Sequence, residues 1–160
     1  EFLRDQGKKL GMYVAAQGSS EASPITYYRL QEWHCWRFRA VSSSFWAYAD
    51  TGGVKNNWTM INGGGARNFS PVYIDSKSVT DGKRWLAIFE GVKDNEYLQM
   101  IQRRVDELRA AKRSHSQLEE AEKLLANLAN EVIEAANGGD LNACDAGRLR
   151  ALDVLKALME

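Results

Sequence analysis

The stretch from Ser42 to Asp50 combines aromatic and polar side chains that could bind a sugar. It reads Ser-Ser-Ser-Phe-Trp-Ala-Tyr-Ala-Asp, and alternate residues of a strand face opposite sides. One side then carries Trp46, Tyr48 and Asp50, which offer an indole, a phenol and a carboxylate. The other side is small and apolar, which suits close packing under a helix. An alternative interpretation is that Trp46 and Tyr48 only fill the core, with their polar tips hydrogen-bonded.

Two further segments hold candidate sugar-contacting residues. Leu10–Ala16 is a short apolar run that predicts a buried strand, and its alternation places Tyr13 and Gln17 on one side. Trp58 lies in the glycine-rich segment Thr51–Ser70, and a loop of this length in a compact domain is usually functional or mobile. An exposed Trp58 would offer a flat platform for a sugar ring. The alternative is that this side chain packs into the loop's own core.

The segment between the two predicted strands indicates a helix. Ser23-Pro24 is a typical helix start, and the helix is expected to run to about Arg39, with Phe38 near its apolar face. A strand, a helix and a second strand form a βαβ unit, whose strands are parallel with a right-handed crossover. Functional groups of such sheets gather where the strands end, here at Gln17 and Asp50.

The second half of the chain predicts helices. All aromatic residues lie between Phe2 and Tyr97. We expect Thr80 or Asp81 to cap a helix that runs from Arg84 to about Arg113, with a bend at Asp94-Asn95 where its apolar pattern is interrupted.

Two more helices follow in the predicted arrangement. Ser116 and Glu119 fit a capping box, and the apolar stripe after them ends at Asn137-Gly138-Gly139. A last helix spans about Gly147 to Met159. We expect these helices to pack on the preceding long one as an antiparallel group.

Composition excludes several classes of function. The 21 basic and 21 acidic residues leave no net charge, which argues against a nucleic-acid partner. No apolar run approaches the roughly 18 residues of a membrane span.

Cys35, in a predicted helix, and Cys144, in a predicted loop, are expected to be free thiols. His34 and His115 have no visible triad partners, and His34 has no metal ligand one turn away. We therefore predict no metal and no cofactor.

Three stretches carry a resemblance to a known family. Tyr28-Arg29-Leu30 with Trp33, followed by Phe45-Trp46-Ala47-Tyr48, is similar to an Arg-Leu-Leu-x-Trp helix and a Gly-Phe-x-x-Trp strand. The run Phe-Glu-Gly-Val-Lys-Asp-Asn-Glu-Tyr-Leu from Phe89 is similar to Leu-Arg-Glu-Gly-Ile-x-Asp-x-Glu-Tyr. The tail has a helix, an Asn/Gly/Asp loop, Arg148 and a leucine-rich helix. Together they resemble the C-terminal third of a (β/α)8-barrel glycoside hydrolase of the β-N-acetylgalactosaminidase type, family 123, and its uncharacterised relatives.

This resemblance implies an α/β fold class. Residues 1–113 would form the C-terminal portion of a TIM-type (β/α)8 barrel, with its last two strands and helices, and residues 114–160 a helical extension. Leu10–Ala16 would be the seventh strand and Ser43–Ala49 the eighth. The candidates on these strands would face the barrel mouth and its carbohydrate substrate; they are Tyr13, Gln17, Trp46, Tyr48 and Asp50. The family also implies a secreted or periplasmic location.

The resemblance further implies an Asp-Glu pair on an earlier strand, whose acid protonates the leaving oxygen while the substrate's acetamido group attacks. The only such pair here, Asp106-Glu107, lies in a predicted helix, so the catalytic residues are expected to be absent. Two or three strands cannot close a barrel. We therefore expect a fragment whose remaining N-terminal part, or a partner chain, supplies the other strands. The alternatives are a non-catalytic carbohydrate-binding module or a helical scaffold that docks on another chain.

Overall fold

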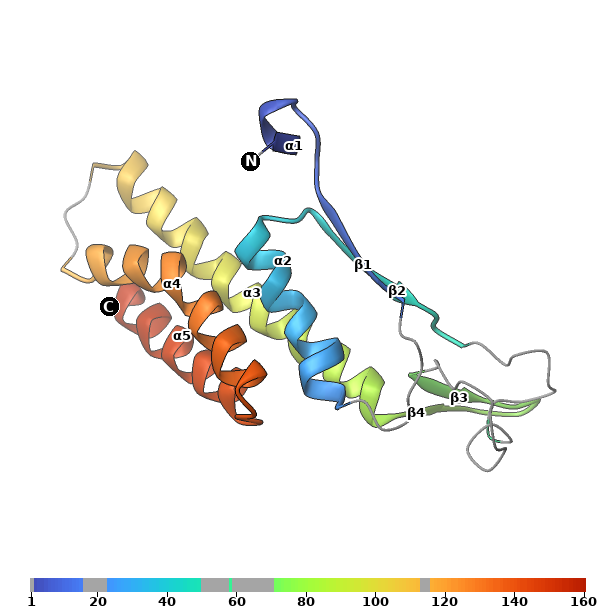
Figure 1. The fold of residues 1–160 in the computed structure, drawn as a ribbon. Coiled ribbons are helices and arrows are strands. Elements are labelled where there is room, and N and C mark those ends of the chain that lie inside the picture. The colour runs from blue at the N-terminus through green and yellow to red at the C-terminus, as the bar shows by residue number, and fades with distance from the viewer. Residues whose placement is uncertain (1, 16–22, 50–57, 59–70, 113–115) are drawn as a thin grey trace.

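The computed structural model describes residues 2–15, 23–49, 58, 71–112 and 116–160. Helices form one body, and two narrow strand pairs extend from it (Figure 1). Along the chain the elements are α1 (Phe2–Asp5), β1 (Gly11–Ala15), η1 (Ile25–Arg29), α2 (Leu30–Phe38), β2 (Ser42–Trp46), β3 (Val72–Ile74), β4 (Val79–Asp81), α3 (Lys83–Ala110), α4 (Leu118–Asn137) and α5 (Ala143–Met159). The fold mixes helix and sheet, and the described residues form no closed barrel.

Strands β1 and β2 are parallel, as the βαβ prediction requires. Their register runs from Gly11 beside Ser42 to Ala15 beside Trp46. The crossover between them consists of η1, a π-helical turn that the sequence did not predict, and α2, which continues it. The prediction that Leu10–Ala16 forms a buried strand is wrong, because every second residue of β1 is exposed, and most of β2 is exposed as well. The reason is that, among the described residues, each strand pairs only with the other.

In the described part of the chain, the crossover covers one face of this strand pair. The Phe45 ring packs edge-on against Tyr28 of η1, with the ring centroids 6.2 Å apart. From α2, Gln31 Nε2 donates a hydrogen bond of 2.9 Å to the backbone oxygen of Ser44. The crossover therefore lies over the Phe45 side, while Tyr13 and Trp46 remain exposed.

Strands β3 and β4 form an antiparallel hairpin before the long helix. The expectation that Thr80 or Asp81 caps that helix is wrong, because both residues belong to β4. Asp75 explains the turn: its Oδ1 accepts hydrogen bonds from the backbone amides of Lys77, at 2.7 Å, and Ser78, at 2.9 Å. An aspartate that bonds the amides just after it reverses the chain. Gly82 then precedes α3 in an extended conformation.

The main core lies between the helices. Helices α4 and α5 run antiparallel and pack on α3, and α2 lies across α3 and α4 (Figure 1). The predicted apolar stripe of α4 is confirmed, since most of its members are buried in this core. The largest fully buried side chains include Trp33, Leu30, Leu98, Ile101, Leu128, Ile133 and Leu158.

Several local expectations differ from the structure. Helix α4 begins after Gln117 without any side-chain cap bond, so the predicted capping box at Ser116 does not form. Helix α5 begins at Ala143, four residues earlier than predicted, so Cys144 lies in a helix. Phe38 is exposed rather than part of the core. Cys35 and Cys144 are free thiols, as predicted, and both are buried.

Gly147 marks the closest approach of the helices. A Cβ atom on this residue of α5 would lie 2.5 Å from Val132 Cγ2 of α4 and 3.0 Å from Trp33 Cη2 of α2. Three helices therefore meet at a position where only a hydrogen atom fits.

We predict that Gly147→Ala lowers the free energy of unfolding by about 1–3 kcal/mol through overpacking, despite the better helix propensity of alanine. Urea denaturation measures the change. The control is Gly138→Ala, where φ is −76° and the nearest atom to an added Cβ is 3.3 Å away. That variant is expected to stay within about 0.5 kcal/mol of the wild type. An unchanged midpoint for Gly147→Ala would show that the helices can separate at no cost.

Candidate functional site

Tyr13 and Trp46 lie on the same face of the parallel strand pair. Tyr13 is beside Ser44, and Ala15, two residues further on, is beside Trp46. Side chains of paired residues point to the same side of a sheet, so the predicted alternation is confirmed as far as Ala15 and Trp46, where the two strands end. The side chains of Tyr13 and Trp46 are 59% and 50% exposed. They therefore form an accessible aromatic surface near the carboxyl ends of both strands.

Tyr48 lies in a turn beyond the end of β2 and contacts the long helix. Its ring meets the Trp85 ring of α3 edge-on, with the centroids 5.2 Å apart, and Tyr48 itself is 48% exposed. The chain leaves β2 through a cis peptide bond between Trp46 and Ala47. The other two candidates on these segments, Gln17 and Asp50, lie outside the described residues.

Trp58 packs on the hairpin strand β3. Its indole stacks on Tyr73 of β3, with the ring centroids 4.5 Å apart and the planes 23° from parallel. The residue is half-buried to exposed, at 38%. One indole face is thus taken by Tyr73, and the structure combines features of the platform and of the packed residue that the sequence left as alternatives.

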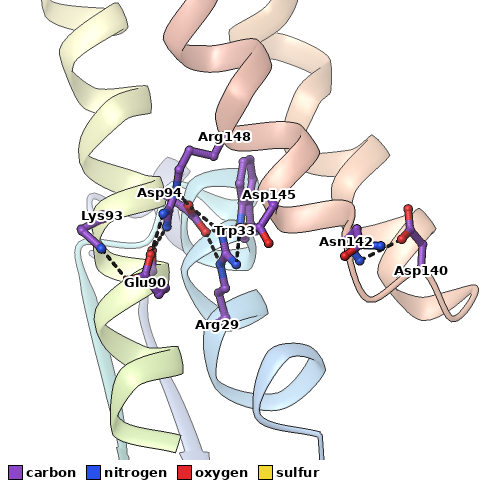
Figure 2. Close-up of polar contacts among 9 residues, drawn as sticks. All are labelled: Arg29, Trp33, Glu90, Lys93, Asp94, Asp140, Asn142, Asp145 and Arg148. Carbon is purple, nitrogen blue, oxygen red and sulfur yellow. Dashed lines mark hydrogen bonds and ion pairs between the residues drawn. The ribbon is translucent and has the colours of Figure 1, made fainter. Parts of the chain in front are cut away.

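A buried charge cluster that the sequence analysis missed lies at the centre of the helices (Figure 2). Asp94 of α3 is 1% exposed. Its Oδ2 accepts hydrogen bonds from Arg29 Nε at 2.7 Å and from Trp33 Nε1 at 3.1 Å. Its Oδ1 accepts from Arg148 Nε at 2.5 Å. One carboxylate therefore joins η1, α2 and α5 to α3.

The two arginines have second partners at the edge of this cluster. Arg29 Nη1 lies 2.8 Å from Asp145 Oδ1. Arg148 Nη1 donates to Glu90 Oε2 at 2.5 Å, and its Nη2 donates to the Glu90 backbone oxygen at 2.8 Å. Lys93 also pairs with Glu90. Burial alone would lower the pKa of Arg29, but the hydrogen bonds and charge of Asp94 together with the hydrogen bond to Asp145 raise that pKa. Both arginines stay charged.

Helix α3 is continuous through Asp94 and Asn95, so the interruption of the apolar pattern there does not mark a break in the helix. Asp94 falls on the buried stripe with Gly91, Leu98 and Ile101, and its polarity reflects inward ion pairing rather than a break. An acidic residue at a core position of an apolar stripe, in a chain with arginine at a core position of another helix, is the signal that could have revealed the pair. Both oxygens of Asp94 are already used, so the cluster holds the fold together and offers no open position for a ligand.

The described residues contain no set of three His, Cys, Asp or Glu side chains that could hold a metal ion. His34 is half-buried, its ring stacks against Phe38, and burial lowers its pKa. Burial also raises the pKa of the Cys144 thiol to about 11, which leaves it a poor nucleophile at neutral pH. None of the described helices is long and apolar enough to cross a membrane.

We predict that Asp94→Asn lowers the free energy of unfolding by about 3–5 kcal/mol, because it leaves the buried Arg29 and the half-buried Arg148 without their shared anion. Urea denaturation followed by circular dichroism measures the loss. Asp153→Asn, at an exposed position of α5, is the control and is expected to stay within about 0.5 kcal/mol of the wild type. Equal midpoints for the two variants would contradict the role of Asp94.

A second prediction concerns the stability of the fold at low pH. The hydrogen bond from Lys93 and the contacts with Arg148 lower the pKa of Glu90 below its ordinary value of 4.5. Glu90 therefore stabilises the fold fully above that ordinary value, and this contribution is lost as the pH falls through the lower value of the folded state. Glu90→Gln should lose less stability than the wild type between about pH 5 and pH 3. Glu96→Gln, a change at an exposed position of the same helix, should lose as much stability as the wild type over this pH range. The same slope of unfolding free energy against pH in all three proteins would contradict the prediction.

Comparison with known proteins adds no relative. No protein-family model, no curated protein and no solved structure matches the chain. The resemblance to glycoside hydrolase family 123 therefore rests on the three sequence stretches, and the site rests on the geometry described above.

Proposed function

We propose that this chain forms part of a glycoside hydrolase-like (β/α)8 barrel and supplies sugar-contacting residues at its mouth, while other strands supply the catalytic carboxylates. The observation that carries the proposal is the strand pair β1–β2. It is parallel, it is covered by its crossover on one face, and it exposes Tyr13 and Trp46 on the other. Parallel sheets occur almost only where both faces are covered.

The residue sizes on the open face suit the interior of a barrel. Gly11 lies beside Ser42 on this face, and a Cβ on Gly11 would be 2.6 Å from Ser42 Oγ. Small residues thus lie at the start of both strands, and the large Tyr13 and Trp46 follow towards their ends. A small barrel fills its interior with layers of side chains of this kind.

The carboxyl ends of the strands are where a barrel enzyme binds its substrate. Trp46 ends β2 at the same level as Ala15 at the end of β1, and Tyr48 lies just beyond. Indole and phenol side chains combine an apolar body with a polar tip, which suits a sugar ring with its hydroxyl groups. Gln17 and Asp50, next along each segment, are further candidates for hydrogen bonds to those hydroxyls.

The unpaired edges of β1 and β2 support the proposal that a longer polypeptide or a partner chain supplies further strands. Among the described residues, β1 and β2 pair only with each other, and a two-stranded unit is marginal by itself. Helix α3 also exposes apolar side chains on a side turned away from α2. Leu86, Phe89 and Val92 are 54%, 56% and 42% exposed. Further βα units of a barrel would cover both features.

The acid of such an enzyme is assigned to those further strands. Asp106 and Glu107 lie on the exposed surface of α3, where they accept hydrogen bonds from Gln102 and Arg104 of the same helix. Neither is near a strand end. The family resemblance implies a β-linked N-acetylhexosamine as the substrate class and a secreted or periplasmic location.

The proposal is tested by an NMR titration of the isotope-labelled chain with N-acetylgalactosamine. We expect weak binding that shifts the indole signal of Trp46, and Trp46→Ala should weaken it about tenfold, or roughly 1.4 kcal/mol. Phe89→Ala removes an equally exposed aromatic ring from α3 and should leave the affinity unchanged. Near-ultraviolet circular dichroism checks that both variants keep the helical core. Shifts that avoid Trp46, or an equal loss in the two variants, would contradict the proposal.

A further inference from the structure

A groove opens where α2 ends and leaves the channel between α3 and α4 uncovered. Its cavity volume is about 660 Å³. The apolar part of its lining includes Val105, Leu125 and Ala129, and polar side chains surround that part. The polar lining residues are Arg37, Arg39, Asn95, Gln99, Gln102, Arg109, Glu122 and Asn130. A small apolar surface among a few polar groups is typical of a small-molecule site.

Positive charge dominates this groove. Arg109 Nη2 lies 2.6 Å from Glu122 Oε1, and Glu122 is the only carboxylate among the lining residues. Arg37 and Arg39 flank the end of α2. In the part of the chain that the structure describes, no ion pair involves either of them, and the Arg37 guanidinium lies over the Phe38 ring. Two guanidinium groups therefore remain for an anionic ligand.

Asn130 adds an independent sign of a ligand. Its Oδ1 atom is buried and has no hydrogen-bond partner, and the residue belongs to the wall of the same groove. A buried acceptor without a donor destabilises the fold, and most such atoms in proteins are satisfied. Oδ1 itself is out of reach of a molecule in the groove, but Asn130 as a residue is only half-buried, so a turn of its amide group would bring this acceptor to a hydroxyl group of a bound molecule.

The backbone of Arg39 is the third observation. Arg39 follows α2 with φ of 52° and ψ of 44°, and Ala40 N donates to Cys35 O at 2.8 Å. This is the helix-ending arrangement in which glycine is strongly favoured, because a Cβ is unfavourable at positive φ. An arginine at this position lowers stability and at the same time places a guanidinium group at the groove.

We propose that this groove binds a small organic anion that carries hydroxyl groups, either a hydroxycarboxylate or a phosphate ester. Arg37 and Arg39 bind the anionic group, since the guanidinium fork matches carboxylate and phosphate oxygens. The Asn130 amide turns towards the groove so that its Oδ1 accepts a hydrogen bond from a hydroxyl group, and the carbon skeleton lies against the apolar part of the groove. This site lies on the helices, apart from the strand face, and does not depend on the barrel proposal.

Arg39→Gly separates a binding role from a capping role. Glycine suits the left-handed conformation, so the variant should have a higher Tm than the wild type. The same change should weaken the binding of citrate and of glucose 6-phosphate about tenfold, because it removes a charged hydrogen-bond donor. Isothermal titration calorimetry at constant ionic strength measures the affinities, and differential scanning calorimetry measures the Tm.

Lys112→Gly is the matched control. Lys112 is also a basic residue with φ of 52° after a helix, but it is not part of the groove lining. The Lys112→Gly variant should have a higher Tm than the wild type and unchanged affinities for both probes. Asn130→Ala should weaken the binding of both hydroxylated probes and leave the binding of inorganic phosphate unchanged. The proposal is overturned if neither hydroxylated probe binds the wild type, if Arg39→Gly binds as tightly as Lys112→Gly, or if Asn130→Ala has no effect.

Discussion

The structure depends on one buried carboxylate. Asp94 sits at the middle of the longest helix and accepts hydrogen bonds from Arg29, Trp33 and Arg148, which belong to three other helical elements. A charge at this depth is tolerated only because both of its oxygens have charged or strongly polar partners. The same bonds fix the directions in which α2 and α5 cross α3. The apolar side chains around Trp33 then pack in one arrangement, and Gly147 allows α4 and α5 to approach that indole closely.

The position of the strand pair β1–β2 depends on this charge cluster. Arg29 ends the π-helical turn of the crossover and is tied to Asp94, while Tyr28 beside it contacts Phe45 of β2. Gln31, two residues after Arg29, donates a hydrogen bond to the backbone of the same strand. A two-stranded parallel sheet has little stability of its own. The charge cluster holds the crossover against α3, and the crossover in turn fixes the orientation of the strand face that carries Tyr13 and Trp46.

Sequence patterns predicted the parts of this fold whose cause is local or follows from chain connectivity. The apolar stripe of α4 and the parallel pairing of β1 with β2 are confirmed, since a strand–helix–strand order leaves one favoured handedness. The alternation that places Trp46 opposite to Phe45 follows from the geometry of any strand. The hairpin β3–β4 was missed because each strand has only three residues, and its turn depends on hydrogen bonds of Asp75. The capping box at Ser116 was expected from a motif, but the helix begins after Gln117 without it.

The sequence by itself determined which side chains are available and which of them share a face: the aromatic residues of the strand segments, the neutral overall charge and the periodic helices of the tail. Only the tertiary structure decided the partners of the charged residues. Asp94 meets Arg29 across 65 positions of the chain and Arg148 across 54, and periodicity within one helix contains no information about such distant pairs. The groove beyond the end of α2 is equally a product of packing, because it exists only where a short helix ends between two longer ones. Local patterns determine which face of an element is apolar, whereas the partner of each buried polar atom is set by how those faces are brought together.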